Sequence, residues 1–302
     1  MFTVLASFAA ASCCHTAQAD IISFGTFDME FVEIGSPGNA DDTMGNPNPA
    51  GAVAYTYQMG KFEVSRDMIT NANAVGGLGI TLQDMSFLGG NGVNRPATGV
   101  SWNEAARFVN WLNTSTGGTE AYNFTTSGVN DNIALWTSGD AGFDASNPFR
   151  NSLATYVLPS MDEWYKAAYY DPVSMTYFDY PSSDGTIPTA VASGTGDKTA
   201  VYDGQSGPAD ITQAGGLSPF GIMGLGGNVF EWEETSGDLA NSSGSSSRGF
   251  RGGYWGLDSD VLSSSTWLDI SPSSELASSL VFVSQVFRQP RPYRSRDRLR
   301  CC

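Results

Sequence analysis

One short stretch, residues 226–232 (GGNVFEW), carries the most distinctive chemistry in the sequence, because Glu231 stands there between Phe230 and Trp232. The two glycines permit a backbone path that side chains would forbid, and the residues after them alternate polar with large apolar side chains. Such alternation is typical of a tightly packed, extended segment. A carboxylate in that setting needs hydrogen-bond donors or a cation. The alternation alone is equally compatible with a strand that turns Glu231 toward solvent.

A second glycine-rich stretch, residues 248–255 (RGFRGGYW), contains Arg248 and Arg251. Guanidinium groups beside flexible glycines could bind a phosphate or a carboxylate ligand. In a chain with 31 acidic and only 15 basic residues, pairing with acidic side chains inside the protein is the favoured interpretation.

Histidine and cysteine lie only near the two ends of the chain. The single histidine is His15, and the four cysteines are Cys13, Cys14, Cys301 and Cys302. If the amino-terminal segment is removed, an imidazole metal site and a Ser-His-Asp triad are both excluded. Paired carboxylates remain open as catalysts, although their spacing singles out no pair.

Residues 1–19 are apolar and small and end in Ala17-Gln18-Ala19, which resembles a signal peptide with its cleavage site. The run is too short and too interrupted to span a membrane, so we expect no membrane span in the mature chain. We predict a signal peptide over 1–19, a single domain over 20–287 and a basic, disordered tail over 288–302. The expected location is periplasmic, cell-surface or secreted.

Composition limits the partners and the architecture. The formal net charge of −16 argues against nucleic acid or an anionic membrane as a partner and suits a soluble, exported protein. The 35 glycines and the low charged fraction of 15% indicate a turn-rich chain with few long helices.

Local patterns predict the elements that hold these residues. Strand-like alternation runs through residues 24–34 and 53–64. Residues 114–153 and 180–216 are polar and glycine-rich, and we expect long surface loops there.

Three serines mark the starts of predicted helices. Ser65 is a candidate cap for a short helix, while Ser101 and Ser160 each begin a capping-box pattern followed by apolar residues at helical spacing. We expect the latter two helices to be half buried, with Trp102 and Trp164 in the core.

Four stretches, in this order, resemble the family of formylglycine-generating enzymes, also called sulfatase-modifying factor domains. The family patterns are P-V-x-x-V-S-W-x-D-A, L-P-T-E-A-E-W, G-N-V-W-E-W and R-G-G-S-W. The matching stretches are residues 96–105 (PATGVSWNEA), 158–164 (LPSMDEW), 227–232 (GNVFEW) and 251–255 (RGGYW). The resemblance implies one α+β, loop-rich domain of the formylglycine-generating-enzyme type, related to the C-type lectin fold.

The resemblance also sets expectations about activity. Authentic members oxidise a substrate cysteine to formylglycine with two active-site cysteines and copper, and other relatives bind iron through histidines. When Gly252 and Gly253 are aligned with the family's glycine pair, the cysteine positions fall at Leu257 and Leu262. Leucine cannot form a thiolate or coordinate copper, so we expect no catalytic residue of this type and no copper.

Calcium is the one cofactor that the resemblance leaves open. In the family a structural calcium is bound by backbone carbonyls and a carboxylate that correspond to Gly227, Val229 and Glu231, and oxygen ligands of this kind suit calcium. The family's acidic or amide side chain three residues before the motif glycine is replaced by Gly224. The alternative is that Arg251 or backbone amides satisfy Glu231.

Taken together, these features favour an exported, non-catalytic member of the family that acts as a binding or structural module. The two long loops would carry recognition of an extracellular protein or carbohydrate, a partner class that rests on fold analogy. The rival hypothesis is a formylglycine-generating oxidase that acts on cysteine of sulfatases through an active site rebuilt without cysteine.

Overall fold

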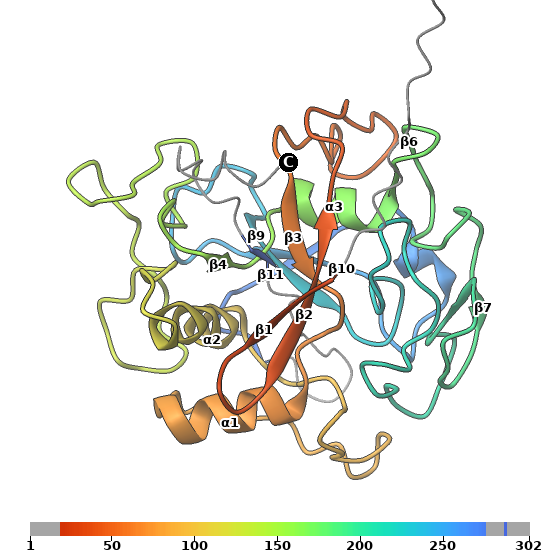
Figure 1. Cartoon of the computed structure of the whole chain (residues 1–302), viewed down its shortest axis with the longest axis horizontal. Coiled ribbons are helices and arrows are strands. Elements are labelled where there is room, and N and C mark those ends of the chain that lie inside the picture. The colour runs from red at the N-terminus through yellow and green to blue at the C-terminus, as the bar shows by residue number, and fades with distance from the viewer. Residues whose placement is uncertain (1–18, 276–286, 289–302) are drawn as a thin grey trace, which may run out of the picture.

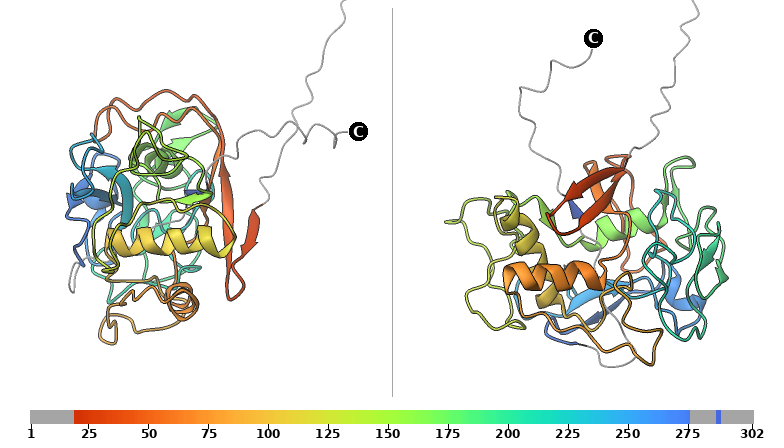
Figure 2. Two further views of the ribbon diagram at one scale, coloured as in Figure 1. Left: turned by 90° about the vertical axis from the view of Figure 1, so that its left-hand side faces the viewer. Right: turned by 60° about the horizontal axis from the view of Figure 1, so that its bottom comes forward.

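A five-stranded antiparallel sheet runs along one side of the molecule in the computed structural model, which describes residues 19–275 and 287–288 (Figures 1 and 2). The strands lie in the order β1-β2-β3-β12-β4. Their bounds are Asp20–Ser23 (β1), Asp28–Ile34 (β2), Tyr57–Gly60 (β3), Phe287–Arg288 (β12) and Tyr156–Val157 (β4).

Both predicted strand regions contain a strand, but each strand is shorter than the predicted region. The region 24–34 contributes β2 from Asp28 onward, because the Phe24 N–H bonds the Phe27 carbonyl at 2.9 Å and closes the hairpin turn between β1 and β2. The region 53–64 contributes only four residues of β3. In the region 24–34 a backbone turn therefore ends the pairing where side-chain alternation continues.

Strand β12 joins the end of the described chain to the middle of this sheet. Phe287 pairs with Met59 of β3 on one side and with Val157 of β4 on the other. Arg288 follows in the same register, so β12 contains both sides of the predicted boundary between domain and tail. The predicted signal peptide, except Ala19, and the rest of the predicted tail lie outside the described residues.

A three-stranded sheet holds both arginines and the central motif. Strand β10 lies between β9 and β11 and is antiparallel to each. The bounds are Glu231–Ser236 (β9), Arg248–Arg251 (β10) and Leu268–Ile270 (β11). The smaller elements are β5 (Tyr170–Asp171), β6 (Thr176–Tyr177), β7 (Thr189–Ala190), β8 (Thr199–Ala200) and a 3₁₀ turn at Ser259–Leu262.

All three predicted helices are present and begin at the expected serines. They are α1 (Arg66–Gly76), α2 (Trp102–Ser115) and α3 (Met161–Tyr169). The Ser65 hydroxyl accepts from the Met68 N–H at 3.2 Å, and Ser101 and Ser160 each form a complete capping box. None of the helices in the described ranges is both long and apolar enough to cross a membrane.

The two long loops extend to either side of the domain (Figure 1). Both are mostly irregular, as predicted, but neither is confined to the surface, since the second contains β7, β8 and the buried side chains of Val201 and Ala209. In the first loop, Tyr122, Phe149 and Arg150 are buried. Their burial was not expected from the polar, glycine-rich composition, because isolated aromatic residues in a polar stretch carry no periodicity.

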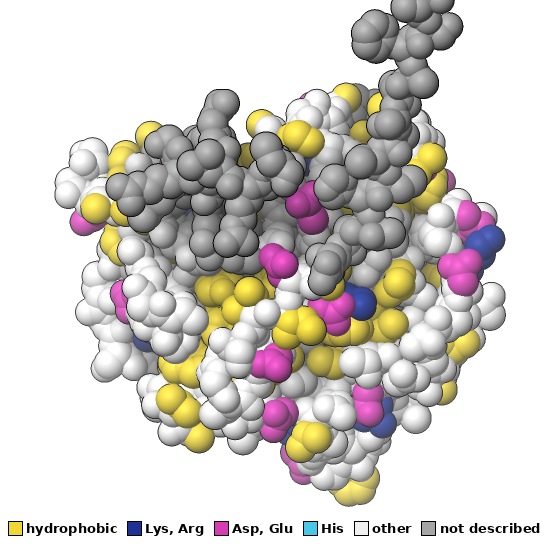
Figure 3. Space-filling model, in the orientation of Figure 1, with side chains coloured by type: hydrophobic (Ala, Val, Ile, Leu, Met, Phe, Trp, Pro, Cys, Tyr) yellow, Lys and Arg dark blue, Asp and Glu magenta, His cyan; other side chains and the backbone are white. Residues whose placement is uncertain are grey.

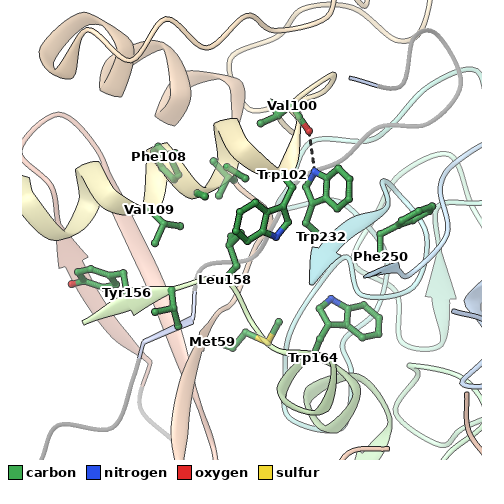
Figure 4. Packing of buried hydrophobic residues seen from close by; sticks show 14 of the residues in the cluster. Met59, Val100, Trp102, Phe108, Val109, Tyr156, Leu158, Trp164, Trp232 and Phe250 are labelled. Carbon is green, nitrogen blue, oxygen red and sulfur yellow. Dashed lines mark hydrogen bonds between the residues drawn. The ribbon is translucent and has the colours of Figure 1, made fainter. Parts of the chain in front are cut away.

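Three tryptophans from three elements meet in the centre of the core (Figure 4). Trp102, Trp164 and Trp232 are each fully buried, which confirms the prediction for the two helical ones. Each indole N–H has an acceptor, since Trp102 donates to the Glu233 carbonyl and Trp232 to the Val100 carbonyl, both at 3.0 Å. The fold is therefore an α+β, loop-rich domain whose core contains the strand that carries Glu231.

Candidate functional site

The central motif turns sharply before it enters β9. Gly227 has φ +86°, and a Cβ there would collide with the Val201 carbonyl oxygen. Asn228 also has positive φ, +60°, and its backbone N–H donates to the same carbonyl at 2.7 Å. Its side-chain oxygen accepts from the Ala209 N–H at 2.7 Å. The left-handed turn thus directs the backbone into the core, where glycine and asparagine tolerate this conformation best.

Glu231 is the first residue of β9 and is fully buried. Its Oε2 accepts from the Trp164 indole at 2.5 Å, whereas its Oε1 has no hydrogen-bond partner among the described residues. Burial, followed by the charge of Glu63, raises the pKa of the Glu231 carboxyl well above its ordinary value. The strand does not turn Glu231 to solvent. Arg251 is not its hydrogen-bond donor either, because that guanidinium binds Glu233 at 2.8 Å.

Glu63 is a second carboxylate in the same region, contributed by the segment between β3 and α1, and it is 1% exposed. Its Oε2 accepts from the Asn228 side-chain amide at 2.6 Å, and its Oε1 has no hydrogen-bond partner in the part of the chain that the structure describes. Burial raises the pKa of the Glu63 carboxyl well above its ordinary value, against the opposing effects of the Asn228 amide and the Val229 N–H. Sequence reasoning missed Glu63; its position between Phe62 and Val64 was the available signal.

The oxygen donors around the motif fit a calcium ion. The predicted Gly227, Val229 and Glu231 lie in one continuous stretch, and the unpartnered oxygens of Glu63 and Glu231 are hard ligands of the type calcium prefers. No group of three or more His, Cys, Asp or Glu that could hold a metal occurs in the described part of the chain. A cation here would therefore depend on two carboxylates and on backbone carbonyls.

A separate buried network centres on Arg150. Its guanidinium lies 3.0 Å from Glu163 Oε2 and 2.7 Å from Glu234 Oε1, and both carboxylates are buried. Tyr122 donates to Glu234 at 2.7 Å, and Tyr55 donates to Glu163. The network links the first long loop, α3 and β9, and its residues hold the core together with charge as well as apolar contact.

The two arginines of β10 are occupied inside the protein. Arg251 pairs with Glu233, as the preferred interpretation predicted, while Trp267 donates to the other Glu233 oxygen at 2.6 Å. Arg248 bonds no acidic side chain within residues 19–275 and donates to the Ser246 and Gly244 carbonyls instead, which differs from the prediction. Its guanidinium lies between the rings of Trp102 (4.5 Å) and Phe149 (4.1 Å). Burial lowers the pKa of the Arg248 side chain to about 10.

The Arg150 network should affect how the free energy of unfolding changes at acidic pH. Burial disfavours charge on Glu163, yet the attraction and hydrogen bonds of Arg150 outweigh it and lower the pKa of Glu163 below its ordinary value. A carboxyl with a depressed folded-state pKa contributes stability that is present above the unfolded-state pKa, about 4.3. That contribution is lost as the pH falls through the folded-state value.

We therefore expect Glu163→Gln to lack part of the loss of stability that the unaltered protein shows below pH about 4. Urea unfolding of both proteins between neutral and acidic pH gives the difference directly. Glu30→Gln, which removes a carboxyl from the half-buried Lys61–Glu30 pair outside the Arg150 network, serves as the control. Parallel curves for Glu163→Gln and the unaltered protein would contradict the expectation.

Apolar packing fills the positions that correspond to the family's cysteines. Leu262 is fully buried, and it packs in a small cluster with Ala200 and Tyr202. Leu257 is partly buried against the main core. The Leu262 Cδ2 lies 2.6 Å from the place a Cβ on Gly253 would take. The side chains at both positions are therefore packing residues.

Among the cavities on the surface of the described residues, two lie beside elements of the fold already named. One, of about 280 Å³, lies between the β1–β2 hairpin and the start of α1 and includes the side chains of Met29, Phe62 and Met68. Figure 3 shows apolar side chains gathered on this face with Asp and Glu scattered around them. The other, of about 390 Å³, includes Trp111 and Phe124 beside the first long loop.

The sequence and the fold of this chain are similar to those of known proteins. Residues 21–277 match the family described as the sulfatase-modifying factor enzyme 1-like domain. No curated protein matches the chain in sequence. Three similar solved structures share 16–19% identity with the chain, a level that supports likeness of fold alone.

Treponema denticola variable protein 1 is 19% identical, with a TM-score of 0.60, and the match covers 91% of this chain and 100% of that one. PvdO from Pseudomonas aeruginosa is 16% identical, with a TM-score of 0.55 and coverage of 90% and 98%. CarF is 18% identical, with a TM-score of 0.54 and coverage of 86% and 98%. The four ordered motifs, the loop-rich α+β fold and the match over residues 21–277 agree, and the chain belongs to the family of sulfatase-modifying factor enzyme 1-like domains.

Proposed function

We propose that this protein is an exported, non-catalytic member of the family that acts as a binding or structural module. The observation that carries the proposal is the side-chain chemistry at the two positions corresponding to the family's cysteines. Leu257 and Leu262 offer no thiolate, and Leu262 is instead part of the packing around Ala200 and Tyr202. On this proposal the motif residues are present because they hold the fold.

The long loops are the proposed recognition surface. The first one borders the cavity of about 390 Å³ that includes Trp111 and Phe124. Aromatic rings beside polar groups suit a carbohydrate or a protein surface, and either is the class of partner we propose. The polar groups of Asn110 and Arg107 in this cavity already bond backbone carbonyls, so recognition there would depend on the rings and on Glu120.

We further propose that calcium binds at the central motif through the Gly227 and Val229 carbonyls and the Glu231 carboxylate. Calcium would supply the positive charge that the buried Glu231 lacks and would fix the turn that leads into β9. Its role in this proposal is structural. Copper has no proposed ligand, because the two cysteine positions are leucines.

A cysteine-peptide oxidation assay tests the absence of catalysis. The purified protein is supplied with copper and a peptide containing the sulfatase-type cysteine, and formylglycine is read as a mass loss on the peptide. We expect no conversion above a sample without protein, because no thiol stands at positions 257 and 262. An authentic formylglycine-generating enzyme under the same conditions is the positive control.

Conversion by this protein would contradict the proposal and favour an oxidase that works without the two cysteines. Export is tested separately by intact mass of the protein from the cell exterior. A mature chain that begins at Asp20 would support it, whereas a chain that retains residues 1–19 would contradict it.

A further inference from the structure

The indole N–H of Trp111 lacks the acceptor that other buried indoles have. Trp111 lies on α2 and is only 7% exposed, yet its N–H donates to no group of the described residues. The indoles of Trp102, Trp164 and Trp232 all donate to acceptors in the core. A buried indole N–H normally has such a partner. The donor of Trp111 is therefore available to a group from outside the protein.

The cavity of about 390 Å³ gives access to this N–H group. Helix α1 ends at Gly76, and Gly76 and Gly77 border the cavity together with Trp111. A Cβ on Gly76 would lie 2.7 Å from the Trp111 Nε1, so even an alanine side chain would cover the donor. The end of α1 also places backbone carbonyls, the negative end of the helix dipole, at the border of the cavity. The Trp111 donor therefore meets a cavity that is rich in acceptors.

A carboxylate borders the same cavity without a partner of its own. Glu120 is exposed, and its side chain forms no hydrogen bond or ion pair among the described residues. The backbone that follows it is fixed, because the Asn110 side-chain oxygen accepts from the Ala121 and Tyr122 N–H groups, each at 2.9 Å. The cavity therefore combines a free donor on α2 with a free acceptor beside this anchored stretch of the first long loop.

Arg107, the basic residue of this cavity, is already occupied. Its guanidinium donates to three backbone carbonyls of residues 126–129, at 2.6–3.2 Å. It also lies 3.9 Å from the centroid of the Phe124 ring, which is half buried and borders the cavity. An anionic ligand would therefore meet the charge of Glu120 without a free cation to bind it.

We propose that this cavity binds a neutral sugar residue of a carbohydrate ligand. This inference rests on the binding function proposed above and narrows its partner at this cavity to a carbohydrate. A sugar hydroxyl both donates and accepts, so one hydroxyl accepts from the Trp111 Nε1 while another donates to Glu120. A lysine or arginine side chain of a protein partner has donors only and would leave the indole N–H unbonded, and a carboxylate would meet the charge of Glu120.

The remaining surface of the cavity suits the same ligand. The half-buried ring of Phe124 offers apolar area against which the C–H groups of a sugar ring pack. The volume of about 390 Å³ lies in the range of small-molecule sites. A hydroxylated ring with one apolar side therefore satisfies the donor, the acceptor and the aromatic surface together.

The test is an NMR titration of the full chain with neutral methyl glycosides, namely those of glucose, galactose, mannose and N-acetylglucosamine. The readout is the proton–nitrogen signal of the Trp111 indole, which is assigned by its absence from Trp111→Phe. We expect one of the glycosides to shift this signal, and Glu120→Gln to weaken its binding by about 10-fold, as loss of a charge-assisted hydrogen bond does. Gly76→Ala, whose methyl group would stand beside Nε1, should weaken binding at least as much.

Glu33→Gln is the matched control for Glu120→Gln. Glu33 is an exposed carboxylate on β2 and does not border the cavity, so this variant should bind the glycoside as the unaltered protein does. If Trp111→Phe fails to fold, through-bond NMR experiments on the unaltered protein assign the indole signal. Glu120 is exposed, so its variant keeps the affinity comparison available in a folded protein.

The results distinguish this inference from the proposal on which it rests. A glycoside that binds without shifting the Trp111 signal, or that binds Glu120→Gln equally well, would overturn this site and leave carbohydrate recognition elsewhere on the protein standing. If no glycoside binds, the inference is wrong, and a shift of the same signal by N-acetyl-lysine amide would indicate a protein partner instead. Formylglycine in the cysteine-peptide assay would contradict the non-catalytic function and would leave these binding results unchanged.

Discussion

Replacing Arg150 by methionine lowers the free energy of unfolding by about 3–5 kcal/mol, the usual effect of removing one partner from a buried ion pair. Arg150 is the cation for both Glu163 and Glu234, and it also donates to the Leu158 carbonyl at 2.9 Å. Methionine fills much of the volume but leaves two buried carboxylates without their cation. Denaturant unfolding at neutral pH measures the loss.

Two further variants test whether the loss of stability comes from buried carboxylates that are left without a cation. Lys61→Met, which breaks the half-buried Lys61–Glu30 pair at 2.7 Å, should cost less than about 1 kcal/mol. Adding Glu234→Gln to Arg150→Met should recover part of the stability, because one uncompensated carboxylate is then gone. If the double variant is less stable than Arg150→Met by the full effect of Glu234→Gln alone, the two side chains act independently and the explanation is wrong.

Trp232→Ala should lower the free energy of unfolding by about 3–5 kcal/mol, as large-to-small substitutions of buried aromatic residues do. The side chain of Trp232 is fully buried, lies edge-on to Phe250 with ring centroids 6.0 Å apart, and donates to the Val100 carbonyl (Figure 4). Alanine would leave a cavity in the centre of the core and an unbonded carbonyl. Thermal or denaturant unfolding provides the measurement.

Trp136→Ala is the matched control for this variant. Trp136 also donates its indole N–H to a backbone carbonyl, that of Ala121 at 2.9 Å, but its side chain is only partly buried. We expect a clearly smaller loss, because less apolar surface returns to water. Equal losses for the two variants would mean that the indole hydrogen bond, and not burial in the core, accounts for the stability that the motif tryptophan provides.

The variants of Arg150 and Trp232 both affect contacts of strand β9. The motif strand β9 presents Glu231, Trp232, Glu233 and Glu234 to a fully buried environment. Each acid there depends on a donor or cation from another part of the chain. These contacts bind the buried acids of β9 to α3, to the first long loop and to β10.

Local sequence determined the starts of the helices. The hydroxyls of Ser101 and Ser160 and the glutamates three residues later satisfy backbone groups within the same turn, so no tertiary contact is needed to recognise them. The family resemblance also needed no tertiary information, because the four short motifs are recognised by their residue types and their order in the sequence. The positions of Leu257 and Leu262 followed from that alignment.

Only the tertiary structure decided which charges meet. Asn228 bonds Glu63 across 165 positions, and Arg150 reaches Glu234 across 84, separations at which sequence spacing carries no distance information. Alternation left open whether Glu231 lies in the core or faces solvent, whereas packing from both sides buries Glu231 and Glu234 alike. Burial of a carboxylate depends on which distant donor reaches it, and that is a property of the folded chain.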